Sequence, residues 1–152
     1  MHLHGFAAVE HYSTIQAIAA GSKLWLFGRG AAGVVLVCYD PATNAWNRLP
    51  GHDRFSDGRG WGSAEHYSTL QMTSIGDRLF VTGRGVRATA LLCFDLATST
   101  WSEVPAHEAF TNAAGWDAER HFSTVKVATD STRIFVIGRG AGKIRLISCG
   151  PL

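Results

Sequence analysis

The sequence predicts an all-β protein, a β-propeller built from three repeats of about 55 residues that each form a four-stranded blade. The first observation is the period, since His11, His66 and His121 are 55 residues apart and so are Arg29, Arg84 and Arg139. The second is that short β-forming segments alternate with turn signals, without helical periodicity. The third is that the middle segments of each repeat are continuously apolar, which suits strands covered on both faces. A β-solenoid is the alternative, but its repeats are usually shorter.

The chain reads as one domain, residues 1–152, with repeats at about 5–59, 60–114 and 115–152. The expected strands are 11–17, 23–27, 34–39 and 46–49 in the first repeat, 66–73, 78–82, 89–94 and 100–104 in the second, and 121–128, 133–137 and 143–149 in the third. A turn beginning at Asp40-Pro41 precedes the last strand of the first repeat. The third repeat has no tryptophan to match Trp46 and Trp101, so its fourth strand is missing.

Composition excludes several classes of protein. The net charge is +2 and the basic residues are scattered, so neither nucleic acid nor a membrane surface is an expected partner. No apolar run approaches the length of a membrane span. The three cysteines are an odd number, and Cys38 and Cys93 fall inside apolar runs, which suits buried free thiols in a reducing compartment. We therefore expect a cytoplasmic protein, or one exported without a signal peptide visible in this sequence.

An enzyme is not expected. The repeated His-Tyr-Ser-Thr segment places a serine beside a histidine in sequence, but a nucleophile and its base must meet in space with an orienting acid. There is no phosphate-binding loop and no paired Cys-x-x-Cys. The histidines lie 55 residues apart with no second ligand nearby in each repeat, which argues against zinc. Every candidate group recurs, and repetition suits multivalent binding better than catalysis.

Two segments carry a resemblance to known families. Tyr-Asp-Pro-Ala-Thr-Asn-Ala-Trp at 39–46, preceded by Leu-Trp-Leu-Phe-Gly at 24–28, resembles the kelch repeat. The segments from Phe55 through Gly60-Trp61 to His66, and from Phe110 through Gly115-Trp116 to His121, resemble the integrin-like (FG-GAP-type) propeller repeat of lectins and related bacterial repeat proteins. This resemblance implies a six- or seven-bladed propeller that binds sugars, N-acetylglucosamine in the best-known lectins, between adjacent blades.

The sequence departs from the integrin-like pattern at the loops between the first two strands. These loops often hold calcium, but here they read Ala-Ala-Gly-Ser at 19–22, Ser-Ile-Gly-Asp at 74–77 and Thr-Asp-Ser-Thr at 129–132. Calcium needs six or more oxygen ligands, several of them carboxylates. We therefore expect no metal and no cofactor.

The candidate ligand-binding residues are those that recur: Trp61, Trp116, His11, His66, His121, Arg29, Arg84 and Arg139. An exposed indole suits the C–H face of a pyranose, whereas a tryptophan wedged between blades would be core. The histidines could donate to sugar hydroxyls or serve as structural hydrogen bonders. The arginines could present a fork of donors to a ligand, or form salt bridges between blades with Glu10 and Glu65.

The expected function is carbohydrate binding by a lectin-like propeller with repeated sites between adjacent blades. The alternative is a kelch-like scaffold for protein–protein interaction without sugar binding. Short and nearly identical loops favour a small repeated ligand, whose identity the sequence does not specify. Three repeats leave two apolar blade faces in water, so we also expect self-association, with a homodimer completing a ring of six blades.

Overall fold

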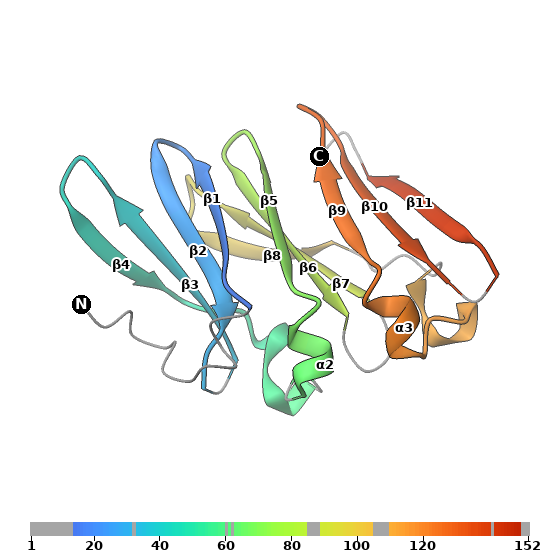
Figure 1. Ribbon diagram of the computed structural model, residues 1–152. Coiled ribbons are helices and arrows are strands. Elements are labelled where there is room, and N and C mark those ends of the chain that lie inside the picture. Colours follow the sequence, from blue (N-terminus) through green and yellow to red (C-terminus); the bar gives the residue numbers. More distant parts are fainter. Residues whose placement is uncertain are drawn as a thin grey trace.

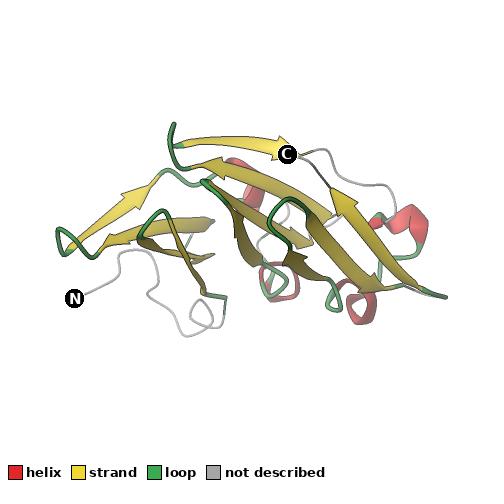
Figure 2. Cartoon of the chain, turned by 90° about the horizontal axis from the view of Figure 1, so that it is seen from above, coloured by secondary structure: helices red, strands yellow, loops and turns green. Residues whose placement is uncertain are grey.

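The computed structural model describes residues 14–31, 33–59, 61, 63–84, 89–104, 110–140 and 142–149, and shows an all-β chain of three antiparallel sheets. The sheets follow one another along the chain without closing a ring (Figures 1 and 2). The first sheet contains β1 (Gln16–Ala20), β2 (Lys23–Arg29), β3 (Val34–Asp40) and β4 (Ala45–Leu49). The second contains β5 (Gln71–Ile75), β6 (Arg78–Arg84), β7 (Thr89–Asp95) and β8 (Thr100–Val104), and the third contains β9 (Lys126–Thr129), β10 (Ile134–Arg139) and β11 (Ile144–Cys149).

Each sheet is a meander in which consecutive strands pair, and its middle strands are the apolar runs of the sequence. The turn between β3 and β4 shows how local chemistry sets the strand ends. The carboxylate of Asp40 accepts a hydrogen bond from the Ala42 amide at 2.9 Å, and Asn44 adopts a left-handed φ of 54° before β4 begins. The amide hydrogen bond, followed by that of Lys23, lowers the pKa of Asp40.

The core lies between neighbouring sheets. One cluster joins the first sheet to the second and includes Trp25, Phe27, Leu36, Leu79 and Leu92. A second cluster joins the second sheet to the third, through Phe80, Leu91 and Cys93 on one side and Ile134 and Val136 on the other. The middle sheet is therefore buried on both faces, which explains the continuous apolar character of β6 and β7.

The first strands of the sheets lie side by side, β1 next to β5 and β5 next to β9 (Figure 1). Gln71 on β5 bridges to β9 with both ends of its side-chain amide: Nε2 donates to the carbonyl of Val125, and Oε1 accepts from the Val127 amide at 3.0 Å. The strands β4 and β8 lie at the opposite edges of their sheets. Successive sheets thus converge along one edge and diverge along the other.

The predicted first strand of the second and third repeats begins too early. Residues 64–67 and 119–122 form one-turn helices, α2 (Ala64–Tyr67) and α3 (Glu119–Phe122), and the strands start only at Gln71 and Lys126. Short 3-10 turns also precede them, η1 (Asp53–Phe55), η2 (Asp57–Arg59) and η4 (Asn112–Ala114). These helices are only one turn long, too short to produce a helical periodicity in the sequence, and the all-β fold class is confirmed.

The repeated threonine explains this difference. The Thr69 hydroxyl donates to the carbonyl of His66 at 2.6 Å and accepts from the Arg84 amide at 2.7 Å. Thr124 makes the same pair of hydrogen bonds, with His121 at 2.6 Å and with the Arg139 amide at 2.8 Å. One hydroxyl therefore closes a helical turn and fastens it to the end of a neighbouring strand, which local β-propensity does not reveal.

Within the described residues the third sheet has three strands, in agreement with the predicted truncation of the last repeat. Cys38 and Cys93 are buried free thiols, as expected. No helix in the described part of the chain is long and apolar enough to cross a membrane.

Candidate functional site

The sequence-predicted site residues gather where α2 and α3 lie, at the lower end of the sheets in Figure 1, called here the helix end. The opposite end carries the hairpin turns and is called the hairpin end. His11 lies outside the described residues. Trp61, Trp116, His66, Arg29 and Arg84 occupy the junctions between sheets, whereas His121 on α3 and Arg139 on β10 lie at the end of the last sheet.

The two tryptophans are core wedges. Trp61 is 2% exposed and Trp116 is 1% exposed. Trp61 packs edge-to-face on Phe55 with ring centroids 4.5 Å apart, and a Cβ added at Gly83 would lie 2.8 Å from its ring. Neither indole face is open to solvent, so these rings have no surface on which a pyranose could stack. Their burial supports the core alternative.

The first two arginines join one sheet to the connector that follows it. Arg29 is buried, forms a 2.5 Å ion pair with Asp57, and lies 5.4 Å from the centre of the Tyr67 ring. The expected salt bridge with Glu10 or Glu65 is therefore not the one found for Arg29 among the described residues. A buried guanidinium needs such partners, because an unpaired charge is costly away from water.

Arg84 repeats this arrangement one sheet later. Its guanidinium lies 5.4 Å from the centre of the Phe122 ring and donates to the side-chain oxygen of Asn112 and, at 3.3 Å, to the carbonyl of Trp116. Burial lowers the pKa of Arg84, and Asp117 acts in the opposite direction. Arg139 occupies the equivalent position in the third sheet, but its side chain is exposed.

His66 also belongs to a junction. Its Nδ1 lies 2.7 Å from the Ser63 hydroxyl, and its ring stacks on Phe122 at 6.0 Å. Burial lowers its pKa, opposed by Glu65 and reinforced by Arg84. His121 has alanine at the position that corresponds to Ser63, and its Nδ1 is buried without a hydrogen bond in the described part of the chain. The helix end is thus built to hold one sheet against the next.

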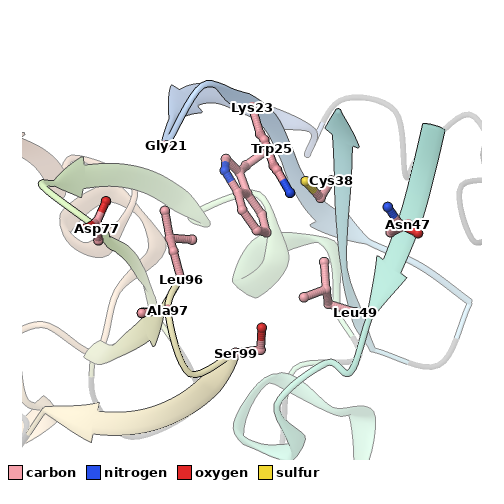
Figure 3. Close-up of a pocket in the computed structure, with 10 residues that line it drawn as sticks. All are labelled: Gly21, Lys23, Trp25, Cys38, Asn47, Leu49, Asp77, Leu96, Ala97 and Ser99. Atoms are coloured by element: carbon pink, nitrogen blue, oxygen red, sulfur yellow. The ribbon is translucent and has the colours of Figure 1, made fainter. Parts of the chain in front are cut away.

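A pocket of about 380 Å³ opens at the hairpin end, between the first and second sheets (Figure 3). The first sheet and its β1–β2 turn contribute Gly21, Lys23, Trp25, Cys38, Asn47 and Leu49, and the turns of the second sheet contribute Asp77, Leu96, Ala97 and Ser99. The indole of Trp25 stands near the middle of the pocket in Figure 3, between Leu96 on one side and Cys38 on the other.

The polar groups of the pocket are arranged around an apolar floor. The Trp25 Nε1–H donates to the carbonyl of Ala20 at 3.0 Å, which fixes the orientation of the ring. The Lys23 ammonium is 3.3 Å from the Asp40 carboxylate, which places an ion pair at the pocket edge. Asn47, Asp77 and Ser99 are exposed and can donate or accept hydrogen bonds. Burial raises the pKa of the Cys38 thiol, which keeps it protonated and unreactive at neutral pH.

The side chains that line this pocket are not repeated at the second junction. The positions equivalent to Lys23, Trp25 and Asn47 hold Arg78, Phe80 and Ser102. The wall formed by Leu96, Ala97 and Ser99 comes from the β7–β8 turn, and the third sheet has no corresponding hairpin in the described residues. The expectation of a site repeated between all blades therefore does not describe this pocket.

Among the described residues no group of three or more histidine, cysteine, aspartate or glutamate side chains is placed to hold a metal ion. A comparison with models of known protein families and a comparison with curated proteins both find no match.

Sequence reasoning missed every residue of this pocket. The predicted site residues are those that recur between repeats, and most of them make the sheet junctions. The pocket residues could have been found from a different signal. Equivalent positions near the strand ends, such as Asn47 and Ser102, hold different side chains in different repeats. The kelch-like segment 24–28 contains Trp25, and the segment 39–46 ends next to Asn47, but their resemblance indicates only the fold.

Proposed function

We propose that this chain binds carbohydrate, with one sugar residue in the pocket between the first and second sheets, and has no catalytic role. The observation that carries this proposal is a 380 Å³ pocket whose apolar floor, made by Leu49, Leu96 and the small exposed part of the Trp25 indole (6% exposed), is surrounded by hydrogen-bonding side chains. A pyranose presents apolar C–H groups and a ring of hydroxyls, so it is matched by an apolar floor with donors and acceptors at its edge. The pocket is partly apolar and bounded by short turns, which suits a small ligand.

The groups at the edge of the pocket can serve different hydroxyls. The Lys23 ammonium donates only, Asp77 accepts only, and Asn47 and Ser99 do both. We propose N-acetylglucosamine or a related sugar, in keeping with the lectin resemblance, because the Leu49 and Leu96 side chains offer an apolar contact for an acetyl methyl group. The kelch-like protein-interaction scaffold is the competing function.

Titration calorimetry with N-acetylglucosamine and a panel of other monosaccharides tests this proposal, with a glycan array to widen the search. Asn47→Ala should weaken binding roughly threefold to tenfold, the loss of one hydrogen bond. The matched control is Ser102→Ala, at the equivalent position of the second sheet, which should bind as tightly as wild type. The expected stoichiometry is one sugar per chain.

Two outcomes would overturn the proposal. In the first, Asn47→Ala and Lys23→Met leave sugar binding unchanged, and Trp61→Ala abolishes it in a variant that still folds. The sugar site would then lie at the helix end. In the second, the protein binds no glycan. This result would refute the carbohydrate proposal and favour the protein-interaction scaffold.

We further propose that the three sheets are blades of a propeller and that a second copy of the chain completes the ring. Support comes from the arrangement of the sheets, which pack face to face with their first strands along one edge. Two copies supply six sheets, within the four to eight that propellers typically use.

A further inference from the structure

We infer that the outer face of the third sheet is the surface that receives the first repeat of a second copy; this inference rests on the proposed ring. The large hydrophobic side chains that are exposed among the described residues all lie on this face: Ile137 is 41% exposed, Ile144 is 67% exposed and Leu146 is 63% exposed. Ile137 pairs with Leu146, and Arg139 pairs with Ile144, across β10 and β11. The four side chains therefore share one face of the sheet, called here the tail face.

The two junctions inside the chain show what covers this face. In the first sheet the equivalent positions are Phe27, Val34 and Leu36, and all three are buried against the second sheet. In the second sheet the equivalent positions Thr82 and Leu91 are buried, and Leu91 belongs to the cluster shared with the third sheet. The tail face is thus the same surface with its neighbour absent, and the neighbour it fits is another repeat of this sequence.

The helix-end contacts point to the same neighbour. At the first junction Arg29 lies over Tyr67, and at the second both Arg84 and His66 lie against Phe122. The equivalent groups at this end of the chain are Arg139, which is exposed, and His121, which is half-buried and whose Nδ1 has no hydrogen bond in the described residues. The next aromatic in the 55-residue register is Tyr12 of a second copy.

The first sheet provides the matching surface. Ile15, Leu24, Leu26, Val35, Val37 and Trp46 form a separate apolar cluster on the face turned away from the second sheet. These positions correspond to Leu70, Leu79, Val81, Ala90, Leu92 and Trp101, which the second sheet uses to pack against the first. This cluster is called here the head face. A two-fold pair would join tail to head twice and close the ring.

Leu26, Val35 and Val37 are already buried in the single chain. Ile15, Leu24 and Trp46 are only partly buried and would make the first contact with a second copy. We expect dimer formation to depend on protein concentration.

Sedimentation equilibrium of the full chain at micromolar concentration tests the inference. Wild type should form a discrete species of twice the 16.4 kDa chain mass. Leu146→Glu places a charge on the tail face at a residue that is exposed in the single chain, so the variant should fold and sediment as a monomer. Thr43→Glu, in the exposed β3–β4 turn, is the matched charge control and should remain dimeric.

Two further variants address the helix end. Arg139→Ala should weaken dimerisation about fivefold to thirtyfold, as loss of a partly desolvated cation–π contact predicts. Tyr12→Ala should do the same, whereas Tyr12→Phe should dimerise like wild type, because Phe122 makes the equivalent contact with Arg84.

A monomeric wild type, undefined aggregates, or a dimer that persists in Leu146→Glu would each overturn the inference. Sugar binding reports separately, because the pocket lies within one chain. A monomeric Leu146→Glu variant that still binds sugar would show that the tail-face inference and the carbohydrate proposal stand independently, and a dimer without sugar binding would refute only the latter.

Discussion

Replacing Trp61 with alanine should destabilise the protein strongly, because this side chain fills the junction between the first two sheets. The ring is 2% exposed, packs on Phe55 at 4.5 Å, and lies against Gly83 and Leu70. Truncation of a buried tryptophan removes its transfer free energy and leaves a cavity, which costs ~3–5 kcal/mol. For a chain of this size that loss lowers the Tm by roughly 6–20 °C.

Urea denaturation followed by far-UV circular dichroism measures this loss without relying on tryptophan fluorescence. Trp61→Phe is the matched variant, because Phe6 stands at the equivalent position of the first repeat. It should lose less stability, since phenylalanine retains an edge-to-face contact with Phe55. The reasoning would be refuted if Trp61→Ala had the wild-type urea midpoint and had lost sugar binding, because the indole would then be a ligand surface.

Three further predictions concern the backbone, acid stability and metal dependence. Gly83→Ala should lower the free energy of unfolding by ~1–3 kcal/mol, because the added Cβ would lie 2.8 Å from the Trp61 ring. Gly142→Ala should leave stability unchanged, since nothing lies within 4 Å of its added Cβ. Equal urea midpoints for the two variants would contradict this prediction. The Thr132 amide is the main cause that lowers the pKa of Asp130 from 3.8 to about 2, so the carboxylate stabilises the fold above pH 4 and loses this effect as the pH falls toward 2. Asp130→Ala should therefore be less stable than wild type at neutral pH and indistinguishable near pH 2; a constant difference across this window would count against the mechanism. Dialysis against EDTA should leave the Tm and any sugar affinity unchanged, and a fall of several degrees would reveal metal ligands not recognised in the sequence.

The middle strands of each sheet could be predicted from the sequence because their signal is local. Strands β2, β3, β6 and β7 are apolar runs bounded by turn residues, and the structure places them within two residues of the predicted bounds. Their burial on both faces follows from the same composition. The three strands that the described residues of the third sheet form were also predicted, from the missing counterpart of Trp46 and Trp101.

The start of the second and third repeats was predicted wrongly because its conformation depends on a distant partner. Residues 66–69 contain β-formers, yet the Thr69 hydroxyl is held by the Arg84 amide, 15 residues away, and by the carbonyl of His66. Tertiary hydrogen bonding therefore decides between a strand and a helical turn. The role of Trp61 was undecided for a similar reason: whether an indole is buried or exposed depends on the neighbouring sheet.

The helix end and the hairpin end are separate, which explains why the repeated residues identified the sheet junctions and did not identify the pocket. Each junction poses the same packing problem, so the same residue types recur: a tryptophan against a glycine, and an arginine against an aromatic ring. The side chains of the pocket between Trp25 and the β7–β8 turn do not hold one sheet against the next at the helix end. They differ from their counterparts in the other sheets. Stability and ligand binding should consequently be separable, since residues that fasten the helix end do not line the pocket at the hairpin end.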